Sequence, residues 1–289
     1  MATFALIIAG ALVTSNSASL ALANWPTFGR NEQVVLSGAA WQYAHRLIAL
    51  LVGTLTLILA IWTWRTDRRF WMKQLAMTAL GVVILQAFLG GLAVLRSLPP
   101  VISTAHAVLG QTSFCLAIAI VLFTGRRFVR QEPRAARDSR KPSLITLTNL
   151  SVLVVYVQVV LGGLFRHNAS NWEPHVFGAA AVTFILIWTA VRVLSYYSEL
   201  EDLRRPAILV LSLVIVELCF GFLSFLTKVV WGLQGTQAGT LMISSTVSHT
   251  AVGALLLAST VVLAIQSRRH LAILDRQTVV TTAPRHVVA

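Results

Sequence analysis

Hydrophobic residues along the chain form long runs separated by short polar stretches. A bilayer core about 30 Å thick requires roughly 20 consecutive apolar residues in a helix. Eight runs approach that length, so the pattern predicts an all-α integral membrane protein with eight transmembrane helices. The loose bounds of these runs are Ala2–Leu22, Ala44–Trp64, Gln74–Leu95, Val101–Thr124, Ser143–Phe165, Pro174–Leu194, Pro206–Leu226 and Gly239–Ile265.

The first run differs from the others because polar residues interrupt it. Its apolar segment Phe4–Val13 is followed by TSNSAS and then by LALAN, which imitates a signal-peptidase site. The run lacks the basic segment that begins a signal peptide, and its centre is polar. We therefore expect it to be retained as the first helix. The alternative to a complete first helix is that the start codon is mis-assigned.

Composition and charge agree with a membrane protein and add its orientation. Of the 289 residues, 56% are hydrophobic and 11% are charged, which excludes an ordinary water-soluble domain. The net charge of +13 lies mostly in short loops, a distribution that indicates membrane topology and no nucleic-acid partner. By the positive-inside rule these basic segments and both termini are cytoplasmic; the segments are Arg65–Lys73, Arg126–Lys141 and the tail with Arg268, Arg269 and Arg276.

Two sequence patterns recur along the chain. VILQAFLGGL (Val83–Leu92) returns as VYVQVVLGGL (Val155–Leu164) and more loosely as VIVELCFGFL (Val214–Leu223), each with Gln or Glu four residues before Gly. The second, fourth, sixth and eighth runs share a histidine four residues before a small residue: His45/Ala49, His106/Gly110, His175/Ala179 and His249/Gly253. These repeats predict two pseudo-symmetric four-helix bundles. The expected divisions are an N-terminal half (1–125), a cytoplasmic linker (126–142), a C-terminal half (143–267) and a cytoplasmic tail (268–289).

The four repeated histidines are expected to share the outer leaflet, because each run that carries one begins at the outer surface. A single histidine there would most simply be a hydrogen-bonded structural residue, but imidazole within a membrane is costly and usually functional. One pair in each bundle suits one haem in each half, His45 with His106 and His175 with His249. The small residue at i+4 would leave room for a flat ligand. A zinc site or a proton relay fits this one-sided distribution over four helices less well.

Four basic residues are expected near the outer ends of the helices: Arg46, Arg96, Arg166 and Lys228. They are candidates to bind the carboxylate groups of haem. The alternative is that they extend to lipid phosphates at the membrane surface.

Several stretches resemble the haem A synthases, which act in cytochrome oxidase maturation. They are GALVTSNSASLALANWPTFG (Gly10–Gly29), AHRLIALLVG (Ala44–Gly53), LQAFLGGLAVLRSLPP (Leu85–Pro100) and VQVVLGGLFRH (Val157–His167). The resemblance implies an eight-helix protein of the bacterial inner membrane that oxidises the C8 methyl group of haem O to a formyl group. It also implies that His175 and His249 are axial ligands of a haem b and that His45 and His106 face the haem O substrate. The haem O synthase is a candidate partner, and the electron donor is left open.

The chain departs from this family at Gln42, where members that make haem A typically carry a glutamate implicated in catalysis. Gln42 would lie in the catalytic site with His45 and His106, but an amide cannot shuttle a proton or carry negative charge. A non-catalytic haem-binding or electron-transfer protein is therefore the alternative function, and a transporter, which only the repeat suggests, is a third. The nearest acid along the chain is Glu32. Glu217 replaces the glutamine of the sister repeats and is expected to serve helix packing or proton supply.

Overall fold

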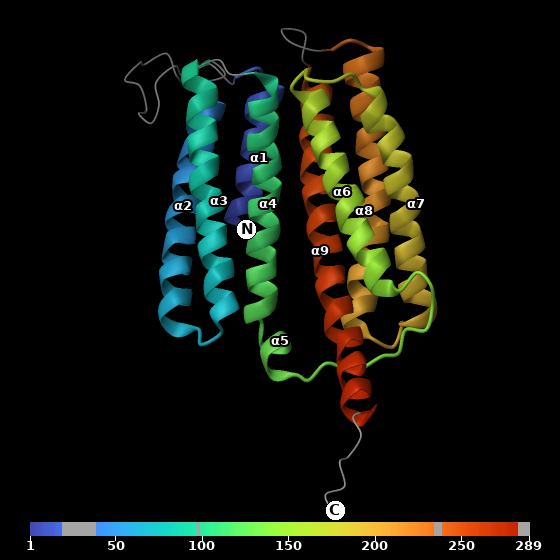
Figure 1. Cartoon of the computed structure of the whole chain (residues 1–289). Helices are drawn as coiled ribbons and strands as arrows, with labels where there is room; N and C mark the ends of the chain where they lie inside the picture. Colours follow the sequence, from blue (N-terminus) through green and yellow to red (C-terminus); the bar gives the residue numbers. More distant parts are fainter. Residues whose placement is uncertain (19–38, 97–98, 234–238, 283–289) are drawn as a thin grey trace, which may run out of the picture.

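The protein is all-helical in the part of the chain that the structure describes (Figure 1). This computed structural model describes residues 1–18, 39–96, 99–233 and 239–282, and it describes no side chain of Arg96 or of residues 272–282. The elements are α1 (Ala2–Ser15), α2 (Ala39–Thr66), α3 (Phe70–Arg96), α4 (Pro100–Thr124), α5 (Arg126–Arg130), α6 (Leu144–Arg166), α7 (Glu173–Tyr196), α8 (Glu201–Phe225), the π-helical turn η2 (Leu226–Val230) and α9 (Thr240–Thr282).

Seven helices among the described residues are long and apolar enough to cross a membrane. They begin or end within a few residues of the predicted runs, and they confirm a multi-pass membrane protein. Helix α1 has 14 residues and is shorter than a span. At about 1.5 Å per residue its length is roughly 21 Å. The rest of the first predicted run, from residue 19 onward, lies outside the described residues.

Helix α1 and the seven spanning helices pack as two rings of four neighbours. In the first ring α1 contacts α2 and α4, and α3 contacts α2 and α4. In the second, α6 contacts α7 and α9, and α8 contacts α7 and α9. Figure 1 shows the two rings side by side, with α2, α4, α7 and α9 all beginning at the end of the molecule drawn at the top. The histidines of these four helices therefore lie toward one end of the fold.

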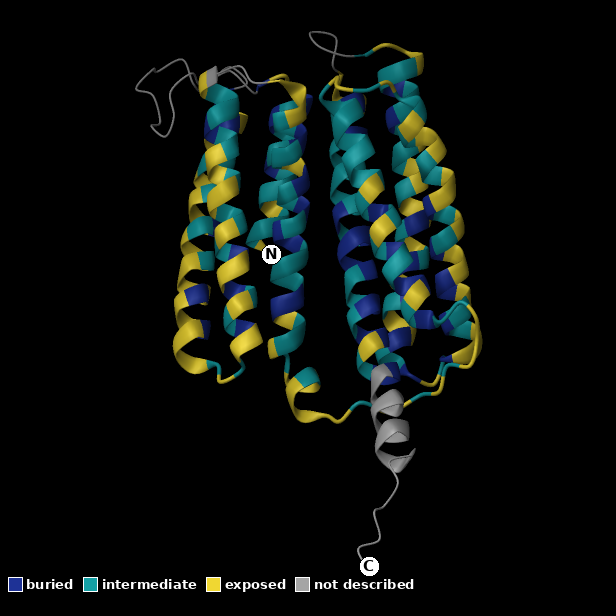
Figure 2. Cartoon of the chain, viewed as in Figure 1, coloured by how far each residue is buried: buried dark blue, intermediate teal, exposed yellow. Residues whose placement is uncertain are grey.

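The two rings meet through α1 and α4 on one side and α6 and α9 on the other. Part of this interface is apolar: Phe114 of α4 forms a cluster with Ala254 and Ala258 of α9, and Phe4 and Ile7 of α1 are among the side chains packed against it. The small side chains of α9 let the neighbouring helices approach closely, as is common where membrane helices pack. Helix α9 is accordingly the most enclosed of the spanning helices (Figure 2).

Many residues of the other spanning helices are exposed (Figure 2), and large apolar side chains are common among them. Examples with more than half of their surface exposed are Trp62, Ile84, Phe177, Phe184 and Phe222. Such a surface would be a liability in water, but it is compatible with lipid. The exposure pattern agrees with the prediction of a membrane protein.

At the opposite end of the fold, the linker packs against the start of α8 and the late part of α9. Arg127 pairs with Glu201 at 2.5 Å and with Asp202 at 3.4 Å. His270, in the predicted tail, is only 4% exposed, and its Nδ1 lies 2.6 Å from the Arg134 carbonyl oxygen. It is buried because α9 continues beyond its predicted end at Ile265, and the linker folds over it.

Candidate functional site

The structure brings the four repeated histidines together in two pairs. His45 of α2 faces His106 of α4, with ring centroids 6.4 Å apart and ring planes at 78°. His175 of α7 faces His249 of α9, with centroids 5.9 Å apart and planes at 72°. Each pair therefore lies within one ring of helices, in the combination that the repeat predicted.

Each of these imidazoles packs over a glycine of a neighbouring helix. A Cβ atom built on Gly90 of α3 would lie 3.1 Å from His106 Cε1, and one on Gly162 of α6 would lie 2.8 Å from His175 Cε1. In the same way, a Cβ atom on Gly10 of α1 would lie 3.2 Å from His45 Cε1, and one on Gly221 of α8 would lie 3.1 Å from His249 Cε1. A larger residue at these positions would displace the rings. Sequence analysis identified the Gln-x-x-x-Gly repeat without finding this use of its glycine.

The packing is reciprocal, and it corrects one expectation. The small residue after each histidine was expected to clear a face for a flat ligand, but Gln86 of α3 covers Gly110, and Glu217 of α8 covers Gly253. In α7 the glycine covered by Gln158 is Gly178, one residue before the predicted Ala179. These small residues let the polar side chain of the adjacent helix fit between the two backbones.

The hydrogen-bond partners determine which nitrogen of the imidazole is available to a ligand. His106 Nδ1 lies 3.0 Å from the carbonyl oxygen of Gln86. Because a carbonyl oxygen only accepts, Nδ1 carries the proton and donates it, and Nε2 keeps a free lone pair. His249 Nδ1 lies 3.1 Å from Glu217 Oε1, a close contact with a carboxyl oxygen that does not have hydrogen-bond geometry. Metal-bound histidines commonly make a contact like that of His106 through their second nitrogen.

The spacing within each pair fits two imidazoles that share one metal ion. A bond from a metal to an imidazole nitrogen is about 2 Å long, and the ring centroid lies roughly 1 Å behind that nitrogen, so centroids on opposite sides of one metal are about 6 Å apart. The observed separations of 6.4 and 5.9 Å agree with that value. Among the described residues no group of three or more His, Cys, Asp or Glu side chains gathers to hold a metal ion. The donor set therefore suits haem, whose ring supplies the other ligands, better than zinc.

The predicted basic residues lie in different surroundings. Arg166 has protein partners on both sides of the interface between the rings: it donates to the Ala11 carbonyl at 2.9 Å, to Ser15 Oγ at 2.8 Å and to Thr250 Oγ1 at 3.0 Å. Its guanidinium group thus ties α6 to α1 and α9, a role that sequence analysis missed because the partners are hydroxyl and carbonyl groups far away in sequence. Arg46 is partly buried next to His45, and the side chain of Arg96 lies outside the described residues.

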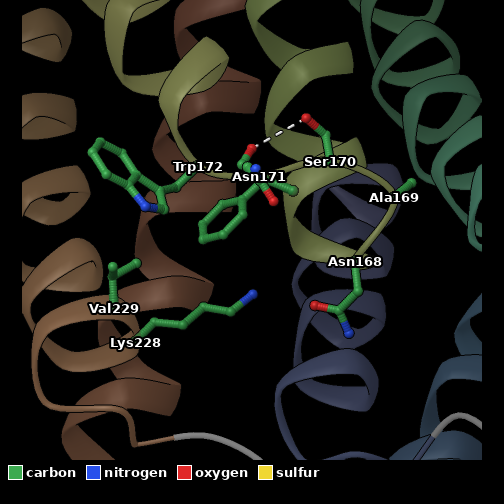
Figure 3. A pocket seen from close by; sticks show the side chains of 8 residues that line it. Asn168, Ala169, Ser170, Asn171, Trp172, Lys228 and Val229 are labelled. Carbon is green, nitrogen blue, oxygen red and sulfur yellow. Dashed lines mark hydrogen bonds between the residues drawn. The ribbon is translucent and has the colours of Figure 1, made fainter.

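Lys228 lines a cavity of about 450 Å³ at the end of the second ring where α7 and α9 begin. Its ammonium group lies 4.5 Å from the centre of the Phe165 ring. Figure 3 shows the lysine side chain extending from η2 toward the loop that joins α6 to α7, where Asn168, Ser170, Asn171 and Trp172 form the other wall. One cation among several amide and hydroxyl groups suits an anionic group such as a carboxylate.

His167 begins the same loop, directly after Arg166. Burial and the neighbouring positive charges of Arg166 and Lys228 lower its pKa from 6.5 to about 4. The imidazole is therefore neutral at physiological pH and adds no positive charge beside the Lys228 cavity.

Gln42 is buried in α2, one turn before His45, with 4% of its surface exposed. Residues three apart on a helix share a face, so Gln42 and His45 point in similar directions. Glu32, the nearest acid along the chain, lies outside the described residues. The structure thus encloses Gln42 in the first ring as expected, while its catalytic role stays a prediction.

Comparison with known proteins links this arrangement to one family. The family model described as cytochrome oxidase assembly protein matches residues 31–172, which include His45 and His106. The chain is 27% identical to the haem A synthase of Symbiobacterium thermophilum over 231 residues, covering 65% of this chain and 74% of that protein. It is 28% identical to the haem A synthase of Halalkalibacterium halodurans over 261 residues, covering 76% and 82%. The matched region and these relatives, at modest identity, support the haem A synthase family of cytochrome oxidase assembly proteins.

Proposed function

We propose that this protein is a haem A synthase of the bacterial inner membrane, an oxidoreductase that converts the C8 methyl group of haem O to the formyl group of haem A. The observation that carries the proposal is the pair of facing histidines in each ring, with centroids 6.4 and 5.9 Å apart. Relatives named haem A synthase, which align with most of the chain, support the assignment of the reaction.

The proposed topology has eight membrane helices in two pseudo-symmetric halves, with both termini in the cytoplasm. Residues 1–125 hold the substrate and residues 143–267 hold haem b, while the linker (126–142) and the tail (268–289) are cytoplasmic. The positions of the basic segments support this orientation, because the α2–α3 loop, the linker and the end of α9 share one end of the fold (Figure 1). The histidine pairs lie toward the opposite, outer end.

The chain's own side chains bind and orient the two ring systems. His45 and His106 hold haem O between them, so that one methyl group has a fixed position when the oxidation takes place. His175 and His249 ligate haem b, which supplies electron transfer when bound. The carbonyl of Gln86 keeps the proton of His106 on Nδ1 and thereby leaves Nε2 for the iron.

Cations near the outer end bind the haem carboxylates. Lys228 is best placed for this role in the second half because it lines the cavity at that end. Arg46 and Arg96 take the role in the first half, and Arg166 contributes chiefly by holding the rings together through its bonds to α1 and α9. A haem O synthase is the proposed partner that supplies the substrate.

The proposal is tested by co-expression with a source of haem O, followed by extraction of the haems and identification by mass. The wild-type protein is expected to yield haem A. His45→Ala and His106→Ala are expected to abolish haem A while haem b stays bound in the second half. Haem-loaded protein that never forms haem A would support the alternative, a non-catalytic haem-binding or electron-transfer protein. The observation behind this alternative is Gln42, which stands in place of the family's glutamate.

A further inference from the structure

Glu217 is an acidic residue inside a membrane-spanning helix. It lies in the middle of α8, at the position that Gln86 and Gln158 occupy in the sister repeats. Its Oε1 lies 3.1 Å from His249 Nδ1, and 19% of its side chain is exposed. Among the described residues, its Oε2 and the facing His249 Nδ1 are both buried without a partner in hydrogen-bond geometry. A carboxyl group in such surroundings is costly unless it serves a purpose.

The sister glutamines do not contact the imidazoles in this way. His106 Nδ1 meets the main-chain carbonyl of Gln86, at 3.0 Å. The side-chain amide of Gln158 donates to the main-chain carbonyl of His175, at 2.7 Å. Among the described residues, therefore, His249 is the one paired histidine with a carboxylate at its second nitrogen.

Gly253 fixes the position of this carboxylate. A Cβ atom on Gly253 would lie 2.9 Å from Glu217 Oε1, so the absence of a side chain there lets Glu217 reach across to α9. Gly221, one turn further along α8, packs against the same imidazole, because a Cβ atom there would lie 3.1 Å from His249 Cε1. One glycine thus makes room for the carboxylate and the other for the ring.

We propose that Glu217 is a positioning residue whose carboxylate, in close contact with His249 Nδ1, orients this imidazole and lowers the reduction potential of the haem in the second half. This inference rests on the proposed function of the His175/His249 pair. A carboxylate beside Nδ1 fixes the ring orientation and raises the basicity of Nε2, and both effects strengthen its bond to the iron. Negative charge nearby stabilises the more positive, oxidised state of the metal. The haem of the second half therefore gives up its electron more readily than it would with glutamine at this position.

The test compares the midpoint potential of haem b in the purified, haem-loaded wild type and in Glu217→Gln, which restores the residue of the sister repeats. The variant is expected to favour the reduced state at least tenfold more at a fixed potential, a rise of about 59 mV for a one-electron couple. Glu217→Asp keeps the charge and is expected to retain most of the low potential. Glu201→Gln removes the same charge at the far end of α8 and serves as the matched control, with no change expected.

A second variant tests the contact while the carboxylate stays in the chain. Gly253→Ala displaces Glu217 and is also expected to raise the potential, whereas Gly53→Ala, with no atom within 4 Å of the added Cβ, is its control. Unchanged potentials in Glu217→Gln and Gly253→Ala, with a full complement of haem b, would overturn the role of Glu217 and leave the proposed function intact. A wild-type protein that binds no haem b in the second half would overturn the proposed function itself.

Discussion

The glycine beneath each histidine offers a sharp test of how the ligands are held. In Gly162→Ala the added Cβ would lie 2.8 Å from His175 Cε1. Carbon atoms in contact are normally roughly 3.5–4.0 Å apart, so the ring or the helix must shift by about 0.7 Å. Overpacking of this kind costs about 1–3 kcal/mol. Because the displaced ring is also a proposed iron ligand, we expect haem b affinity to fall by about 10–100-fold, the range typical of disturbed support around a metal ligand.

The assay measures haem b per protein in the solubilised, purified variant by its absorption spectrum and measures thermal unfolding on the same sample. Gly53→Ala and Gly81→Ala are matched controls, because an added Cβ meets no atom within 4 Å at either position. Alanine is intrinsically about 0.8–1.0 kcal/mol more favourable than glycine in a helix, so these controls should be as stable as the wild type or more so. Haem b bound equally well by Gly162→Ala and by the controls would refute the view that Gly162 positions His175.

Three further predictions concern other residues of the site. Gln42→Glu is expected to raise the yield of haem A, since a carboxylate can carry charge and transfer a proton; an unchanged yield in extracted haems would mean that Gln42 does not limit the reaction. Arg166→Met removes hydrogen bonds that join α6 to α1 and α9, and each bond to a charged group contributes about 1.5–3 kcal/mol to stability. The unfolding temperature of this variant should therefore fall clearly below that of the control Arg205→Met, which alters an exposed arginine. Folding lowers the pKa of His167 from 6.5 to about 4, so the unfolded chain binds a proton at this imidazole at a higher pH than the folded chain does. The free energy of unfolding should therefore decline as the pH falls from 6.5 toward 4. His167→Gln should flatten that part of the pH profile, and an equally steep profile in the variant would contradict this reasoning.

The sequence alone predicted much of the fold, for a physical reason. A membrane-spanning helix must satisfy its backbone internally and be apolar over about 20 residues, so each span leaves a long signal in the sequence. The histidine pairs were also predictable, because an imidazole in an apolar run is rare and four recur at matching positions. The pairs His45/His106 and His175/His249 are indeed neighbours in the structure.

The packing around the histidines was not predictable, because it depends on contacts between helices. Repetition revealed the small residue after each histidine, but only the structure shows that Gln86 and Glu217 fill the space beside Gly110 and Gly253. The burial of His270 depends on a linker that folds over the end of α9, a contact between segments more than 130 residues apart. Local sequence patterns carry no information on such contacts.

The most direct test of the central claim, that each half holds one haem between its two histidines, is to identify the haems extracted from the purified protein and from two variants. Wild type is expected to contain haem b together with haem O or haem A. His175→Ala should lose haem b alone, and His106→Ala should lose haem O or haem A alone. Loss of the same haem in both variants, or a full complement of both haems in either variant, would contradict the account.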